Sequence, residues 1–233
     1  VDILVAGVLF PSGIVADYAL AARIAALYSF FQLALLKRFA PRAARLLEAK
    51  DFAALRQEFA VCRKLIIGCG ALTTAGILCV APFLLPVFGN YAGAWAFLVW
   101  LAIPTFIQSF YEAADRLLII AGQANVPLAI TASSFGVLVV TPFLTAPLLG
   151  PTAIAAAMAV ASFLFYPVAA VRVRRMFALT TIHPLDLVMM VAGIAALAAY
   201  AASGAAIAGA ASVAVLAAIA LYCCASAIRR TGP

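Results

Sequence analysis

Residues 65–111, LIIGCGALTTAGILCVAPFLLPVFGNYAGAWAFLVWLAIPTFIQSFY, decide the fold, because these 47 residues contain no Asp, Glu, Lys or Arg. Two further runs without these charges cover residues 117–171 and 187–228, with 55 and 42 residues. A helix needs roughly 20 apolar residues to cross the hydrocarbon core of a bilayer. Each run therefore predicts two transmembrane helices joined by an uncharged turn.

The composition of the whole chain agrees with this interpretation. Of the 233 residues, 68% are hydrophobic and 10% are charged, whereas a soluble domain carries about 25% charged residues. The predicted fold class is an all-α integral membrane protein, a polytopic transmembrane helix bundle. We expect a partial span at 1–10 and further spans at about 18–36, 65–85, 92–111, 126–146, 152–171, 185–203 and 207–228.

The basic residues lie in alternate loops. Residues 37–64 hold eight of the fifteen Lys and Arg, and others follow at Arg116, in the loop 172–186 and in the C-terminal tail. The opposite turns (11–17, 86–91, 147–151 and 204–206) hold none. The positive-inside rule places the basic set in the cytoplasm, so we expect a multi-pass protein of the cytoplasmic (inner) membrane with a cytoplasmic C-terminus. The net charge of +7 is then a topology signal, suited to membrane lipids, and nucleic acid is not an expected partner.

Two segments need separate interpretation. Residues 1–10 are too few to cross a bilayer and lack an initiating Met, so we expect the chain to be a fragment with an upstream portion. Residues 41–64, PRAARLLEAKDFAALRQEFAVCRK, have apolar residues at helical spacing. They predict an amphipathic helix on the inner membrane surface that runs into the next span. We expect its residues 46–59 to lie along the membrane surface or to cap the bundle, with Pro41 ending the preceding span.

Several stretches resemble one transporter family. DYALAARIAALYSFFQLALL (17–36) and the basic loop after it are similar to the C-terminal half of bacterial polysaccharide flippases, as are PVFGNYAGAWAFLVWLA (86–102) and AGQANVPLAITASSFGVLV (121–139). These are lipid-linked oligosaccharide exporters of the multidrug/oligosaccharidyl-lipid/polysaccharide superfamily. The resemblance covers residues 1–175 and implies the second lobe of a two-lobe flippase fold. Residues 176–233 are similar to the additional C-terminal hairpin and tail of fourteen-span members.

The resemblance implies transport by alternating access. The expected function is to flip an undecaprenyl-pyrophosphate-linked oligosaccharide from the inner to the outer leaflet for O-antigen, capsule or exopolysaccharide synthesis. The lipid-linked oligosaccharide would be the principal partner, with polysaccharide polymerase and ligase proteins as further ones. Three alternatives stay open: a multidrug or cation-coupled exporter, a lipid II flippase, and a membrane-embedded polymerase or ligase, which the short outer turns disfavour.

A polar stripe in the fourth span is one candidate site. Thr105, Gln108, Glu112, Asp115 and Arg116 share one helical face, and Glu112 and Arg116 stand at the i, i+4 spacing of an ion pair. We expect the helix 92–121 to continue past these charges, with a kink at Pro104. The stripe indicates either a cluster facing headgroups or the inner vestibule of a transport cavity.

Two isolated charges complete the set of candidates. Arg23 is the only charge in residues 18–36, so it either snorkels to the headgroups or holds the pyrophosphate of a flippase substrate. Asp2 either binds a coupling cation or makes a polar contact between lobes. As substrate-binding candidates we take Arg23, Gln108 and Arg116, and as ion-coupling or vestibule candidates Asp2, Glu112 and Asp115.

Enzymatic chemistry is not indicated by the sequence. We find no nucleophile–base pair, metal-ligand pattern or glycine-rich phosphate loop, and His183 is the only histidine. The five cysteines lie in or beside apolar helices without a CxxC spacing, as small buried hydrophobic residues do. We therefore expect neither a metal nor a cofactor.

Overall fold

The computed structural model describes residues 2–88, 93–179, 182–203 and 206–231, which form α-helices and short 3-10 turns without a β-strand. The predicted all-α polytopic membrane fold is confirmed. The helices are α1 Asp2–Leu9, α2 Ser12–Ala26, α3 Tyr28–Glu48, α4 Phe52–Leu84, α5 Ala94–Ser109, α6 Glu112–Ile120, α7 Asn125–Leu149, α8 Ala153–Phe177, α9 Pro184–Ser203 and α10 Ala206–Thr231, with 3-10 turns η1 Leu85–Phe88 and η2 Gly150–Thr152.

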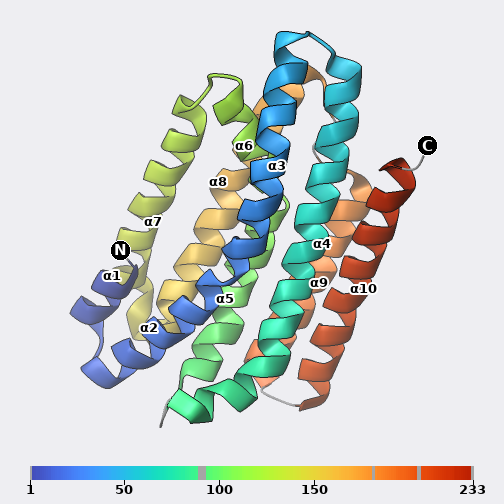
Figure 1. The fold of residues 1–233 in the computed structure, drawn as a ribbon. Coiled ribbons are helices and arrows are strands. Elements are labelled where there is room, and N and C mark those ends of the chain that lie inside the picture. The colour runs from blue at the N-terminus through green and yellow to red at the C-terminus, as the bar shows by residue number, and fades with distance from the viewer. Residues whose placement is uncertain (1, 89–92, 180–181, 204–205, 232–233) are drawn as a thin grey trace.

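Five helical stretches are long and apolar enough to cross a membrane, or six if the bent pair of α5 and α6 is one span. One of the five, Asn125–Phe177, contains both α7 and α8, which reverse direction at η2 and pack side by side (Figure 1). Gly150 permits this reversal because its φ of +57° lies in the left-handed region. The expected spans at 126–146 and 152–171 correspond to these two helices.

The turns gather at opposite ends of the bundle. The α3–α4 turn, the α6–α7 turn and the C-terminal ends of α8 and α10 lie toward one end, which we call the basic end (Figure 1). The ends of α4, α7 and α9 lie toward the other. This arrangement agrees with the alternation of Lys and Arg among the loops, while the assignment of the basic end to the cytoplasm stays a prediction.

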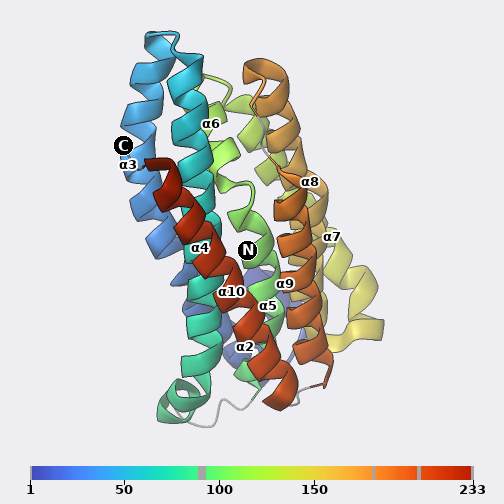
Figure 2. The ribbon, with the colours of Figure 1, turned by 90° about the vertical axis from the view of Figure 1, so that its right-hand side faces the viewer.

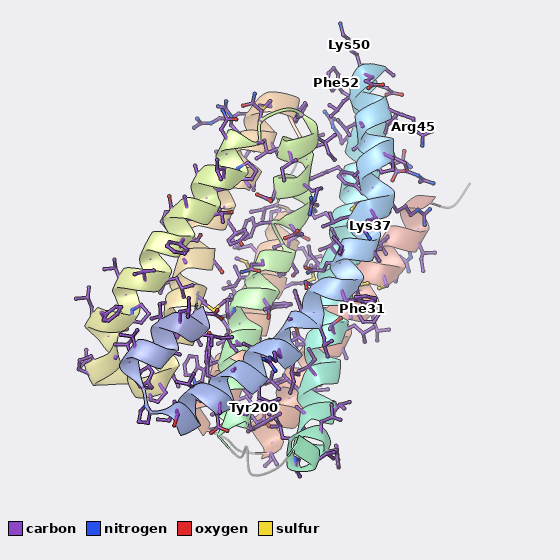
Figure 3. All side chains as sticks on the ribbon, turned by 60° about the vertical axis from the view of Figure 1, so that its left-hand side comes forward. Phe31, Lys37, Arg45, Lys50, Phe52 and Tyr200 are labelled. Atoms are coloured by element: carbon purple, nitrogen blue, oxygen red, sulfur yellow. The ribbon has the colours of Figure 1, made fainter. Side chains whose placement is uncertain are left out.

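The segment after the first long span forms a helical hairpin. The expected single helix over 46–59 is wrong, because the chain turns between Glu48 and Phe52, whereas the expected continuation into the next span is confirmed by α4. α3 continues through Pro41 to Glu48, and α4 runs without a break from Phe52 to Leu84. The expected helix end at Pro41 is therefore also wrong. The hairpin projects from the bundle at the basic end, and Lys37, Arg45 and Lys50 point away from the neighbouring helices (Figure 3).

Local capping places the hairpin turn. At the end of α3, Lys50 N donates to Leu47 O at 3.1 Å and Asp51 N to Leu46 O at 3.0 Å, which is the bonding of a Schellman motif. Lys50 occupies the left-handed position, with φ +55°. Asp51 then caps α4, because its Oδ1 accepts a hydrogen bond from Ala54 N at 2.9 Å.

The helix expected over 92–121 is bent by 47° between α5 and α6, so its straight continuation past the charges is wrong. The break lies at Phe110 and Tyr111, six residues after Pro104. Phe110 N and Tyr111 N each donate to the carbonyl three residues earlier, at 3.2 and 3.0 Å, and Ser109 Oγ donates to Phe106 O at 2.6 Å. A side-chain donor that takes a helix carbonyl in this way favours a bend.

The C-terminal pair of helices is part of the bundle. α10 packs along α4, and α9 packs along α5 (Figure 2). Small residues permit these close approaches: a Cβ added at Gly68 would lie 3.1 Å from Cys223 Cβ, and one at Gly193 would lie 2.7 Å from Phe106 Cζ. The buried side chains of this region include Leu197, Leu216 and Cys223.

Candidate functional site

The break between α5 and α6 lies within a group of polar side chains that we call the central polar cluster. Gln108 Nε2 donates to Ser162 Oγ of α8 at 3.3 Å. The cluster joins residues from three parts of the bundle: Tyr28 and Gln32 of α3, the segment Gln108–Arg116 with its Glu112 and Asp115, and Ser162 and Tyr166 of α8.

The two carboxylates lie between neighbouring helices. Glu112 acts electrostatically on the hydroxyls of Tyr28 on α3 and Tyr166 on α8, and Asp115 acts on Tyr166. Both carboxylate side chains are neither fully buried nor fully exposed. Glu112 therefore lies within electrostatic reach of both α3 and α8, and the choice between a vestibule and a cluster facing headgroups stays a prediction.

Three buried donors of this region lack a hydrogen bond of ordinary geometry in the part of the chain that the structure describes: Tyr28 Oη, Gln32 Nε2 and Arg116 Nε. The Tyr28 hydroxyl still interacts with the side chains of Gln32 and Ser109. Buried polar groups are nearly always hydrogen-bonded, and each one left over indicates a role for water, an ion or a ligand. Tyr28 and Gln32 stand four residues apart on the same face of α3. The cluster is thus rich in donors that an anionic oxygen would satisfy.

The ion pair expected between Glu112 and Arg116 does not form. Across the described ranges, no nitrogen of Arg116 comes within 4.0 Å of a Glu112 oxygen. Both residues lie within α6, so their i, i+4 spacing is kept and the pair is absent because of how the two side chains are placed. Arg116 still lowers the electrostatic cost of the negative charge on both carboxylates.

The other two candidates lie apart from the cluster. Arg23 is exposed on α2, whereas Tyr18, Ala21 and Ile24 of that helix are buried. Asp2 accepts a hydrogen bond from Tyr18 Oη at 3.0 Å, so it joins α1 to α2. The structure thus brings together Gln108, Glu112, Asp115 and Arg116 of the predicted set. Asp2 and Arg23 lie outside the cluster, and their roles in ion coupling and substrate binding stay predictions.

Sequence reasoning missed the contributions of α3 and α8 to the cluster. Gln32 is the only Gln or Asn in the span 18–36, and its spacing from Tyr28 was a usable signal. Ser162 and Tyr166 stand at the same four-residue spacing on α8. None of the four is charged, and for that reason a search for ionisable groups passed over them.

A buried ion pair lies elsewhere, between α4 and α9. Arg63 Nη1 donates to Asp186 Oδ2, and the two side chains are 6% and 4% exposed. The same Oδ2 accepts a hydrogen bond from His183 N at 2.8 Å. Asp186 is the third residue of α9, so this bond caps the N-terminus of the helix. Within the described residues, no group of three or more His, Cys, Asp or Glu is placed to hold a metal ion.

One comparison with known proteins gave a match. A family model described as MatE matches residues 1–145, which is more than half of the chain. No curated protein and no solved structure matched. The matched residues include α1 to α6 and most of α7, and so they contain the α5–α6 part of the central polar cluster.

Proposed function

The chain belongs to the MatE family, whose members are transporters of the multidrug/oligosaccharidyl-lipid/polysaccharide superfamily, and from this premise we propose that it flips a lipid-linked oligosaccharide. The substrate is an undecaprenyl-pyrophosphate-linked glycan carried from the inner to the outer leaflet for surface polysaccharide synthesis. Residues 1–175 act as the second lobe, 176–233 add a hairpin and tail, and the basic end faces the cytoplasm. Polymerase and ligase proteins use the exported glycan.

The donors of the central polar cluster support this proposal. Arg116 Nε is a buried donor without a hydrogen bond in the described chain, and Tyr28 Oη and Gln32 Nε2 make none of ordinary geometry. A pyrophosphate carries acceptor oxygens in excess, and a guanidinium matches their geometry with two parallel N–H donors. Arg116 and Gln108 are therefore the substrate-binding residues, with Arg23 contributing where the exposed face of α2 borders the pathway.

A second function is favoured by the two carboxylates. Glu112 and Asp115 lie between helices in a largely apolar bundle, and acids in such positions often carry protons or cations in transporters. A cation-coupled exporter of drug-like molecules would use them as its coupling site, with Asp2 as a further candidate. In the flippase, the same two residues line the vestibule and orient Arg116.

Complementation of a transport-deficient strain with the full-length protein tests the assignment. We expect Arg116→Ala and Arg23→Ala to abolish surface polysaccharide at normal protein abundance, and the Lys variants to keep partial activity, because Lys retains charge but not the paired donors. Arg45→Ala, exposed on the hairpin, is the matched control. Full activity of an Ala variant at normal abundance removes that arginine from the binding site.

The two functions differ in their response at the carboxylates. If a cation couples transport there, Glu112→Gln should remove the dependence of transport on the proton or sodium gradient. If the residue only lines the vestibule, the variant should keep that dependence and change the apparent substrate affinity. Uptake by proteoliposomes with an imposed gradient measures both quantities.

A further inference from the structure

A groove outside the central polar cluster lies between α3, α4 and the end of α10. It encloses about 420 Å³, which falls within the range of about 300–1,000 Å³ for small-molecule sites. Its floor is apolar and its charged groups stand at one end. The lining side chains include Leu35, Arg38, Phe39, Val61, Leu65 and Ile228. Figure 2 shows the end of α10 resting against α4 beside α3.

The groove lies where three helices change in composition. On α3 the uncharged stretch ends at Leu36, and Lys37 follows. On α4 the uncharged run begins at Leu65. On α10 the uncharged run ends at Ile228. These three changes mark the boundary between hydrocarbon and headgroups at the basic end. The groove therefore extends from the acyl region into the headgroup region.

One cation of the groove is available to a ligand. Arg42 Nη1 lies 2.6 Å from Glu58 Oε1 across the charged end, so these two charges neutralise each other. Arg38, one helical turn earlier on the same face of α3, is exposed and makes no ion pair or hydrogen bond within the described residues. Among the described side chains that line the groove, Arg38 is thus a guanidinium without a neutralising partner.

We propose that this groove binds an anionic phospholipid from the leaflet at the basic end. An acyl chain lies along Leu35, Leu65 and Ile228, and the headgroup phosphate accepts hydrogen bonds from Arg38. The apolar floor and the free Arg38 guanidinium match the two halves of such a lipid, and basic pockets between transmembrane helices bind anionic headgroups in this manner. The site shares no residue with the central polar cluster, so it stands independently of the transported substrate.

Native mass spectrometry of the full-length protein in detergent tests the site, with equimolar phosphatidylglycerol and phosphatidylcholine of identical acyl chains. We expect the wild type to retain phosphatidylglycerol about fivefold over phosphatidylcholine, the factor that one basic residue near a membrane surface contributes. Arg38→Gln should bring that ratio close to one. Arg45→Gln, the matched control two turns further along the same exposed face, should leave it unchanged.

A second variant tests the acyl part of the groove. Leu65→Trp fills the apolar end without a change of charge, so it should lower the retention of both lipids equally. Elution and unfolding temperature like those of the wild type establish that each variant is folded, and Arg38→Gln alone decides the headgroup contact if Leu65→Trp does not fold.

Four results would overturn the proposal. The first is a wild-type ratio near one, and the second is an equal loss in Arg38→Gln and Arg45→Gln, which indicates a diffuse surface field. The third is displacement of phosphatidylglycerol by equimolar polyprenyl pyrophosphate in an Arg38-dependent manner, which assigns the groove to the transported lipid. The fourth is absence of any bound phospholipid from the wild type, which indicates that other protein covers the groove.

Discussion

Helix α4 takes part in two ion pairs that lie five residues apart and have very different surroundings. Glu58 pairs with Arg42 of α3 at the surface, where the side chains are 31% and 43% exposed. Arg63 pairs with Asp186 of α9 in the interior, at 6% and 4%. The exposed pair forms in water at little cost and contributes little. The buried pair has lost its hydration, so each charge depends on the other.

The largest expected effect comes from removing one half of the buried pair. Asp186→Ala leaves the Arg63 guanidinium in the interior without its carboxylate and should destabilise the protein by about 3–5 kcal/mol. Denaturant unfolding in detergent measures this loss. The joint replacement Arg63→Met with Asp186→Leu is the control and should cost only about 1 kcal/mol, because it leaves no buried charge but removes the acceptor of His183 N. A loss below about 1 kcal/mol in Asp186→Ala would mean that water reaches Arg63.

A second variant separates the ion pair from the packing of α9 against α5. A methyl group at Gly193 would lie 2.7 Å from Phe106 Cζ, so Gly193→Ala should cost about 1–3 kcal/mol by overpacking. Gly76 of α4 is the control, because a Cβ there meets nothing within 4 Å, and Gly76→Ala should not destabilise. Equal unfolding temperatures for the two variants would contradict the tight contact.

A third variant tests the exposed hairpin that holds the other pair. Asp51 caps α4 by accepting from Ala54 N, so Asp51→Ala should cost about 1 kcal/mol. Asp51→Asn keeps the acceptor and should recover most of the loss. Faster amide hydrogen exchange over residues 51–56 in Asp51→Ala alone would locate the effect at the cap, and unchanged exchange would argue against it.

The smallest effect is expected for the exposed pair itself. A double-mutant cycle with Arg42→Ala and Glu58→Ala should give a coupling of about 0.2–1 kcal/mol. That coupling should disappear in 1 M salt, where the screening length falls to about 3 Å. A coupling above about 2 kcal/mol that persists in salt would place this pair in the same class as the buried one.

The C-terminal ends of α3 and α6 indicate how far the sequence could predict the fold. The three uncharged runs predicted the all-α bundle because no other structure satisfies the backbone in lipid. Gly122, with φ +76°, ends α6 in the same Schellman bonding that Lys50 provides for α3. A glycine there is a recognisable stop signal and a lysine is not, so the hairpin was mistaken for a surface helix.

The candidate site was predictable in part for a similar reason. Glu112, Asp115 and Arg116 stand out as charges near an apolar run, and the structure places them in one cluster with Gln108. Gln32 and Tyr166 join them only through the packing of α3 and α8, which no spacing within one helix reveals. Arg63 and Asp186 are separated by 123 residues, so no local sequence pattern predicts that they pair.

That separation has a consequence for biosynthesis. At a synthesis rate of about 5–20 residues per second, Arg63 leaves the ribosome roughly 6–25 s before Asp186. During this interval the face of α4 that α10 later covers lies open. Arg63 then lacks the Asp186 carboxylate, and Lys64 lacks the Tyr222 ring, whose centroid lies 5.6 Å from Lys64 Nζ in the finished bundle. Long basic side chains reach the headgroups while they wait for a partner. The arrival of the last two helices therefore moves these cations from the lipid boundary into the protein, and assembly of the bundle is completed from its C-terminal end.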